Sequence, residues 1–162
     1  LMRDALSMRD AGAVSALTFN DAGAASTHAG MTVGVAKGIF NRLGADRPDV
    51  IVAELGDGIL GEYGVQDILL DKELAAAGAA FVMAAPDPVG CWGAVELMRE
   101  RFGLSVAVLT GPATDNEVGR DYIRASLGIP AFNARRDAEG LVGVVQGSLA
   151  TWSAPVAAGT PA

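Results

Sequence analysis

The chain has 162 residues, a formal net charge of -7 and a single cysteine. Its length is that of one ordinary domain, which buries enough apolar surface to fold without disulfides or a structural metal. The negative charge opposes binding to nucleic acid and to anionic membranes, because both need positive potential at the contact. We therefore expect one α/β domain at residues 1–152, followed by a disordered Pro/Ala/Gly tail at residues 153–162.

The composition favours helices packed on a parallel sheet. Hydrophobic residues make up 51% of the chain and aromatic residues only 6%, and there are 21 glycines, which suits a Val-rich sheet better than an aromatic-cored sandwich. No apolar run reaches the roughly 18 residues that a membrane span needs. Cys91 has no partner for an internal disulfide, and no signal segment precedes the domain, so we expect a cytoplasmic protein.

The first third of the chain predicts two helices and two strands. A helix is expected at residues 1–11, a strand at 15–19 and a loop of small residues at 20–30. An apolar stripe predicts a helix over residues 31–43. The continuous apolar run at residues 49–55 then predicts a strand that is buried on both faces.

The remainder alternates between helices and strands. The alternation of helix and strand predicts, through right-handed crossovers, a mostly parallel sheet with helices on both faces. Ligands of such sheets bind beyond the carboxyl ends of the strands. The expected elements are helix 65–77, strand 79–85, helix 89–102, strand 104–110, helix 115–127 and strand 129–132.

An acidic, glycine-rich segment follows the second predicted strand. In the sequence VIVAELGDGILG, an apolar strand ends in Glu54 and Asp57, set among glycines. Two carboxylates at a strand end can hold Mg²⁺, and Gly56 and Gly58 let the backbone approach a phosphate closely. The alternative is that Glu54 caps a neighbouring helix and the glycines only form a turn.

Three segments carry a family resemblance. RDAGA at residues 9–13, NDAGAAST at 20–27 and VIVAELGDG at 50–58 resemble P-loop NTPases of the dethiobiotin synthetase and nitrogenase-iron-protein type, and are most similar to a group of uncharacterised bacterial P-loop proteins. The resemblance covers about residues 8–135. It implies a three-layer sandwich that binds ATP or GTP with Mg²⁺ and activates a small carboxylate metabolite, as an ATP-dependent ligase or NTPase does.

The chain departs from that family in one respect. The phosphate-binding motif GxxxxGK[ST] is absent. Since the chain opens at Leu1, we expect that an N-terminal strand and loop have been removed; the alternative is that the loop was lost and the fold kept for binding. Lys37, in GVAKG, lacks the motif spacing and is interpreted as a solvated helix lysine.

The loop at residues 20–30 holds the only histidine. Ser26 and Thr27 can donate to phosphate or carboxylate oxygens, Asp21 can hold metal-bound water, and His28 can act as an acid or base near neutral pH. The alternative is a helix N-cap by Ser26 or Thr32, with His28 on the surface. Because loops after parallel strands meet at one edge, this loop should converge with Glu54 and Asp57.

Two further strand ends carry polar residues. The helix start after the strand at 79–85 offers free N–H groups to an anion. Nearby Cys91 is interpreted as a packed small hydrophobe, and Trp92 as part of the core. After the strand at 104–110, Thr114, Asp115 and Asn116 could read a nucleotide base, although Thr114 or Asp115 is also a good N-cap. The residues Asn133, Arg135 and Arg136 either face the same pocket or are exposed.

The sequence thus predicts a nucleotide-binding P-loop-NTPase-like domain with a small-molecule ligand and no nucleic-acid or membrane partner; a homodimer is left open. A non-catalytic Rossmann-like binding or interaction domain is the alternative. A NAD enzyme is disfavoured, because GDGILG follows a middle strand and lacks the acidic residue of a dinucleotide fingerprint. The expected site residues are Glu54 and Asp57 for catalysis, Asp21 and Glu54 for the metal, and Ser26, Thr27, Gly56, Gly58, Thr114 and Asn116 for the cofactor.

Overall fold

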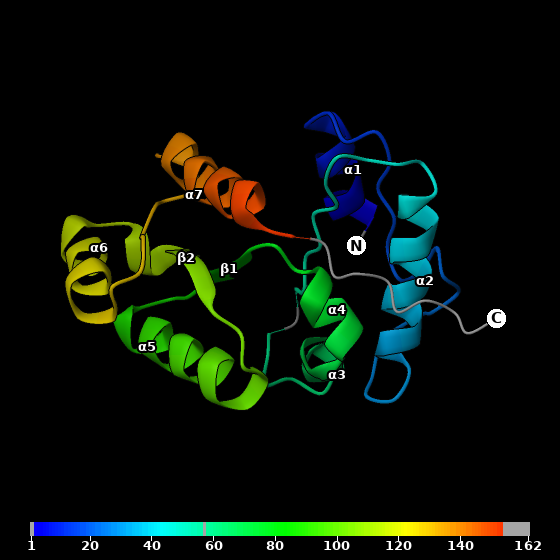
Figure 1. The fold of residues 1–162 in the computed structure, drawn as a ribbon, viewed down its shortest axis with the longest axis horizontal. Coiled ribbons are helices and arrows are strands. Elements are labelled where there is room, and N and C mark those ends of the chain that lie inside the picture. The colour runs from blue at the N-terminus through cyan, green and yellow to red at the C-terminus, as the bar shows by residue number, and fades with distance from the viewer. Residues whose placement is uncertain (1, 57, 154–162) are drawn as a thin grey trace. The chain divides into compact units, whose positions relative to one another are not determined.

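A computed structural model describes residues 2–56 and 58–153 of the chain. The chain divides into two compact units, unit 1 at residues 1–75 and unit 2 at residues 76–162, and Figure 1 shows the elements of each. Asp57 and the predicted tail from Ala154 onward lie outside the described residues. Within the described part, no helix has the length and apolar character needed to cross a membrane.

Unit 1 is built from helices joined by long loops. Helix α1 spans Met2–Asp10 and α2 spans Thr32–Gly44, close to the ranges that the sequence predicts. The expected helix at 65–77 is divided into α3 (Val65–Leu70) and α4 (Lys72–Ala77), the second of which crosses the boundary between the units. The division falls at Asp71, whose backbone is extended and whose carboxylate accepts hydrogen bonds from the backbone N–H groups of Glu73 and Leu74.

The predicted strands at residues 15–19 and 49–55 are wrong. Neither segment forms a strand, and the structure has no strand among the described residues of unit 1. In the second segment Val50 and Val52 are 50% and 73% exposed. An apolar run predicts burial, but a strand also needs a neighbouring backbone to pair with. No described residue of unit 1 supplies one.

Unit 2 contains a parallel strand pair, β1 (Phe81–Ala84) and β2 (Val106–Thr110). The pairing runs from Phe81 opposite Val106 to Ala84 opposite Thr110, with one irregularity after Phe81. The predicted strand at 129–132 is reduced to a single parallel bridge between Leu109 and Ala131, on the other edge of β2. Three chain segments therefore end side by side and send their following loops to one edge.

Helices flank this pair, and Figure 1 shows α5 (Pro88–Leu97) and α7 (Ala138–Thr151) on opposite sides of it. Helix α5 continues into the π-helical segment η1 (Met98–Phe102), and after β2 come a short 3₁₀ turn η2 (Pro112–Thr114), α6 (Glu117–Tyr122) and η3 (Ile123–Leu127). Helix α7 was not expected from the sequence. The mixed helix and parallel-strand character agrees with an α/β fold, whereas the full three-layer sandwich stays a prediction.

The core of unit 2 lies between these helices and β2. Its members are apolar side chains with almost no exposure, contributed by α5, η1, β2, η3 and the segment that bridges to β2: Cys91, Met98, Val108, Leu109, Ile123 and Ala131. Burying such side chains contributes about 1.5–3 kcal/mol each for the larger ones. This core holds the strand ends in place.

Candidate functional site

The carboxylate of Asp21, in the loop at residues 20–30, closes a turn with Thr18. The Asp21 carboxylate accepts hydrogen bonds from the Thr18 backbone N–H, at 2.7 Å, and from the Thr18 hydroxyl, at 2.9 Å. These bonds, the backbone one first, hold the pKa of Asp21 below its ordinary value. Ser26 is exposed, and its hydroxyl lies 3.5 Å from the Thr27 carbonyl oxygen. Asp21 therefore acts as a turn-forming residue here.

Hydrogen bonds join the end of the loop at 20–30 to the residues that precede and begin α3, whereas the expected convergence of this loop with Glu54 and Asp57 stays a prediction. The Thr32 hydroxyl lies 2.7 Å from the His28 carbonyl oxygen and 3.0 Å from that of Tyr63. The Gly30 N–H donates to the Asp67 carboxylate at 3.0 Å. Gly64 has a φ of 81° and packs so closely on Thr32 that a side chain there would overlap it. These contacts tie the start of α2 to the start of α3.

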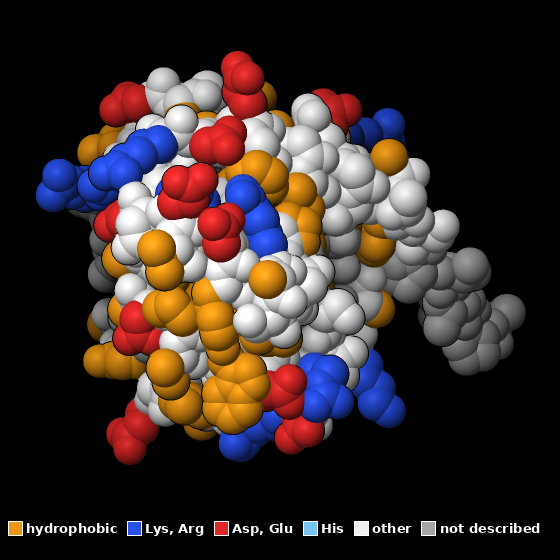
Figure 2. Space-filling view, turned by 90° about the vertical axis from the view of Figure 1, so that its left-hand side faces the viewer, with side chains coloured by type: hydrophobic (Ala, Val, Ile, Leu, Met, Phe, Trp, Pro, Cys, Tyr) orange, Lys and Arg blue, Asp and Glu red, His pale blue; other side chains and the backbone are white. Residues whose placement is uncertain are grey.

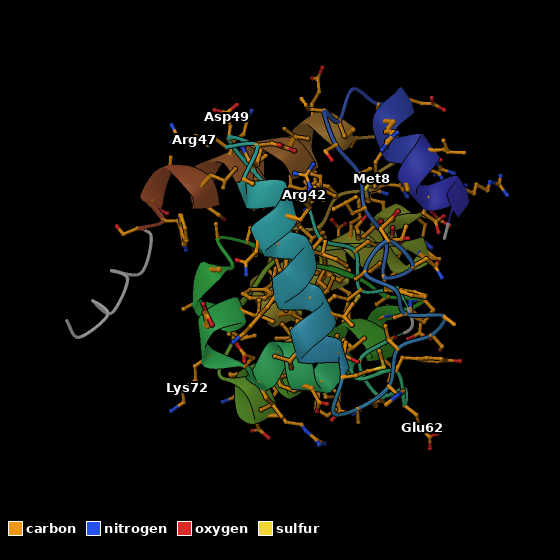
Figure 3. The ribbon with its side chains drawn as sticks, turned by 90° about the vertical axis from the view of Figure 1, so that its right-hand side faces the viewer. Met8, Arg42, Arg47, Asp49, Glu62 and Lys72 are labelled. Atoms are coloured by element: carbon orange, nitrogen blue, oxygen red, sulfur yellow. The ribbon has the colours of Figure 1, made fainter. Side chains whose placement is uncertain are left out.

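The segment between α2 and α3 passes from one end of α2 to the other. In Figure 3, Arg47 and Asp49 lie at the end where α2 finishes, whereas Glu62 lies toward the end where it begins. Glu54, on this segment, is exposed, and so are Gly56 and Gly58. No group of three or more His, Cys, Asp or Glu side chains gathers in the described ranges 2–56 and 58–153. The predicted metal roles of Asp21 and Glu54 stay predictions.

Lys37 is paired and not merely solvated. Its ammonium lies 2.7 Å from a carboxylate oxygen of Glu73 and 3.0 Å from one of Asp71. Hydrogen bonds to Glu73 and then to Asp71 raise the pKa of Lys37. The pKa of Asp71 is lowered, chiefly by the Leu74 N–H and next by Lys37. Lys37 thus joins α2 to the α3–α4 junction.

Unit 2 has an open hollow at the carboxyl ends of β1 and β2, with a volume of about 360 Å³. Parallel strands deliver their following loops to this edge, where ligands of α/β sheets bind. Three proline rings and two polar side chains contribute to its wall. The hollow is lined by Pro86, Asp87, Pro88, Pro112, Ala113, Asn116, Val118 and Gly119; we call it the strand-end pocket.

Both polar residues of the strand-end pocket cap helices. Asp87 is the N-cap of α5, and one of its carboxylate oxygens accepts from the Gly90 N–H at 2.8 Å, with Pro88 in the first helical position. Asn116 is the N-cap of α6, and its side-chain oxygen accepts from the Gly119 N–H at 2.8 Å. The N-cap bonds fix both side chains at the rim. They also place a carboxylate at the start of α5, where the sequence predicts an anion site.

The loop after β2 is in close backbone contact with the loop after β1. Gly111 has a φ of 87° and a ψ of -170°, and a Cβ there would lie 2.8 Å from the Ala85 carbonyl oxygen. The Ala113 N–H donates to that same oxygen at 3.1 Å, and the Ala85 N–H donates to the Thr110 carbonyl. Only glycine adopts this backbone conformation readily. The pocket wall is therefore joined to the strands by backbone contacts.

A buried polar network stabilises the loop after β2. Thr114 has no exposed surface, and its hydroxyl donates to the Gly111 carbonyl at 2.7 Å. Asn133, 6% exposed, donates to the Asp115 carboxylate at 2.8 Å and accepts from the N–H groups of Arg135 and Arg136. Thr114 thus stabilises the loop and does not line the pocket. Of the residues predicted to read a base, Asn116 lines the pocket.

Two arginine side chains donate hydrogen bonds to carbonyl groups of the loop after β2. The Arg120 guanidinium donates to the Thr114 carbonyl at 2.6 Å, and that of Arg136 donates to the Asp115 carbonyl at 2.7 Å. Arg124 donates to the Ala131 carbonyl and lies 5.5 Å from the centre of the Phe132 ring. Guanidinium groups satisfy several acceptors in fixed geometry. The loop after β2 is therefore held on both sides.

Apolar side chains are exposed next to the pocket. Trp92, expected in the core, is 53% exposed, because it lies on the outer surface of α5 near Val89, which is 75% exposed. On α6, Val118 and Tyr122 are also exposed. Figure 2 shows hydrophobic side chains gathered on this side of unit 2, with charged side chains around them. Cys91, by contrast, is fully buried, and burial followed by the Asp87 charge raises the pKa of its thiol.

Sequence reasoning missed Asp87 and the prolines. The signal that could have found them is the PDP sequence directly after β1, since Asp before Pro at a helix start is an N-cap pattern. No model of a protein family, no curated protein and no solved structure matches this chain.

Proposed function

We propose that this chain is a nucleotide-binding α/β domain, and that the strand-end pocket receives the base of ATP or GTP. The observation that carries the proposal is the position of the pocket at the carboxyl ends of two parallel strands, with polar cap residues at its rim. The resemblance to P-loop NTPases, which rests on the first part of the chain, agrees with a nucleotide ligand.

The lining of the pocket supports a planar, partly polar ligand. Its volume of about 360 Å³ lies within the range of small-molecule sites. Pro86, Pro88 and Pro112 offer apolar ring surfaces, while Asp87 and Asn116 offer a hydrogen-bond acceptor and donor. A base needs both kinds of surface, because its faces are apolar and its edge is polar.

The proposal also includes a reaction. The resemblance implies that the nucleotide, with Mg²⁺, activates a small carboxylate. The roles that the sequence predicts for residues of unit 1 in metal binding, catalysis and phosphate contact stay predictions and are no part of the strand-end pocket. A Rossmann-like binding domain without turnover is the second candidate. That candidate is favoured because Oδ2 of Asp21 already accepts two hydrogen bonds from Thr18, as the carboxylate of a turn-forming residue does. Nucleotide binding without phosphate release would distinguish it.

The test is a titration of the full ¹⁵N-labelled chain with ATP and with GTP, with and without Mg²⁺, followed by NMR. We expect amide shifts at Asp87, Val89, Ala113 and Asn116, with an affinity no tighter than about millimolar, or ~4 kcal/mol, because the chain has no GxxxxGK[ST] cradle for the phosphates. Binding confined to other residues, or no shift at millimolar nucleotide, would contradict the proposal.

A matched pair of variants sharpens the test. Asn116→Asp keeps a good N-cap for α6 but removes the side-chain N–H donor and adds charge, so it should abolish the shifts. Asp137→Asn changes the N-cap of α7, which is not among the lining residues, and should leave them unchanged.

A further inference from the structure

We propose that Arg120 and Arg136 form a binding site for a small, doubly charged oxyanion of the phosphate class, at the end of the turn that follows β2. The site goes beyond the proposed function, because neither arginine lines the strand-end pocket. It also contains none of the residues of unit 1 that the sequence predicts to contact phosphate. Both guanidinium groups are held in place, and neither is neutralised.

The two guanidinium groups meet at the end of one turn. Arg120 donates to the Thr114 carbonyl at 2.6 Å. Arg136 donates to the Asp115 carbonyl at 2.7 Å. Thr114 ends the 3₁₀ turn η2 and Asp115 is its C-cap with helical backbone angles, so both carbonyl groups point along the turn axis in the same sense. Because the Cα atoms of consecutive residues lie only about 3.8 Å apart, the two charges approach the same short stretch of backbone.

Neither guanidinium group forms an ion pair with a carboxylate in the part of the chain that the structure describes. By contrast, the charged groups of Lys37 and Arg99 each contact two carboxylates. The carboxylate of Asp115 accepts instead from the side-chain amide of Asn133, at 2.8 Å. Although the chain has 19 acidic and only 12 basic residues, two fixed cations therefore remain without an acidic partner at one place.

The carbonyl groups hold the arginines but do not neutralise them. The carboxyl end of a full helix is equivalent to only about half of a negative charge, and η2 is a single short turn. Both guanidinium groups keep a full positive charge, because arginine is not deprotonated in proteins. Each group also keeps several N–H donors beyond the one that binds a carbonyl. The uncompensated charge and the remaining donors favour an anion with several acceptor oxygens.

The two side chains are accessible to a ligand from solvent. Arg136 is exposed and Arg120 is partly exposed. Phosphate oxygens accept pairs of parallel hydrogen bonds from guanidinium groups, and the fixed positions of both side chains reduce the entropy that binding costs. A doubly charged oxyanion gains more from two cations than a singly charged carboxylate does. The expected ligand is therefore phosphate, either as the free ion or as a small monoester.

The test is a titration of the full ¹⁵N-labelled chain with inorganic phosphate at about pH 8, where the anion is doubly charged. Chloride is exchanged for phosphate at constant ionic strength, and binding is followed by NMR. We expect saturable shifts of the amides of Asp115 and Arg136 and of the arginine Nε–H groups, with a dissociation constant of about 1 mM. Acetate should bind about tenfold more weakly. Glycerol 3-phosphate distinguishes the two ligands: it should bind more tightly than inorganic phosphate if the ligand is a monoester, and no more tightly if it is the free ion.

Arg136→Gln and Arg120→Gln are the decisive variants. Glutamine removes the positive charge and keeps a terminal N–H donor, so each variant should bind phosphate about tenfold more weakly. Thermal unfolding in chloride shows that each variant is folded. Arg99→Gln is the matched control, because it removes the same charge from unit 2 but from an arginine that is paired with carboxylates. The control should leave phosphate affinity unchanged.

Saturable phosphate shifts that are weakened by both decisive variants and kept by the control would support the site. Shifts that grow linearly with phosphate concentration, or that persist with unchanged affinity in both folded variants, would overturn it. An equal loss of affinity in the control would overturn it as well, because net charge alone would then explain binding. The proposed function is tested separately by the nucleotide-dependent shifts at Asp87 and Val89, so the two can fail independently.

Discussion

The glycine-rich loops of unit 1 and the strand-end loops of unit 2 look alike in sequence, since both combine small residues with Asp, Asn, Ser or Thr. They differ in what holds them. In unit 1 the polar groups hold the loops together, as Thr32 does for His28 and Tyr63. In unit 2 the strands and a buried polar network hold the loop after β2. The cap residues Asp87 and Asn116 each use one side-chain oxygen, Oδ1, for the helix cap.

This difference teaches how a binding surface becomes available. A loop that must fold on itself consumes its own donors and acceptors, because each buried polar group needs a partner. A loop delivered by a packed strand has its ends fixed already, and its outer side chains can face a ligand.

The largest effect is expected at Gly111. Gly111→Ala forces a side chain into a backbone conformation that is nearly restricted to glycine, and places its Cβ 2.8 Å from the Ala85 carbonyl oxygen. We expect the free energy of unfolding of unit 2 to fall by about 3 kcal/mol. Urea denaturation followed by tryptophan fluorescence reports on this unit, because Trp92 and Trp152 both belong to it.

Gly103→Ala is the control for that experiment. Gly103 has a φ of 66°, but a Cβ there meets nothing within 4 Å. The substitution should therefore cost only about 1 kcal/mol, the penalty of the left-handed conformation itself. Equal losses at the two glycines would show that the close approach of the strand ends does not stabilise the pocket wall.

An intermediate effect is expected for Thr32→Val in unit 1. The substitution keeps the shape of a buried side chain but removes the hydroxyl shared by His28 and Tyr63, and we expect a loss of about 1–2 kcal/mol. Hydrogen exchange of the amides at residues 58–64 should accelerate. Thr151→Val, which removes an exposed hydroxyl on α7, should leave these rates unchanged. Unchanged rates in both variants would mean that the loops of unit 1 are not tied at Thr32.

The smallest effect concerns the acid stability of unit 1. The folded-state pKa of Asp71 lies below its ordinary value of 3.8, so the stabilisation it provides is present above that value and is lost as the pH falls through the folded pKa. We expect the α3–α4 junction to loosen below about pH 4. Asp71→Asn, which keeps an acceptor for the Leu74 N–H, should flatten this dependence. A carboxyl titration by NMR with a midpoint at or above 3.8 would contradict the prediction.

The helices could be predicted where neighbouring residues determine their bounds. The apolar stripe of α2 and the caps of α5 are written in neighbouring residues, and the observed bounds follow them closely. Helix α7 was missed although Asp137 is its N-cap, because its three internal glycines lower helix propensity and hide the apolar pattern. The break at Asp71 was missed because nothing in the helical pattern of the sequence shows that the backbone of Asp71 itself is extended, so that it ends α3 and its carboxylate binds the Leu74 N–H.

The candidate site was predictable only in part. Asn116 was expected to read a base, and the structure places it in the pocket wall. Thr114, two residues earlier, was expected to do the same, yet it is buried. Sequence spacing cannot separate these two residues, because Thr114 ends a 3₁₀ turn with its side chain buried, whereas Asn116 is the exposed N-cap of α6.

The sequence by itself determined the alternation of helix and strand in unit 2, since β1 and β2 are apolar runs bounded by Gly and Pro. Only the tertiary structure decided that residues 49–55 form no strand and that Asp87 and Asn116 line one pocket. The physical reason is that strand pairing and pocket formation depend on partners distant in the chain, whereas periodicity and capping depend on neighbours.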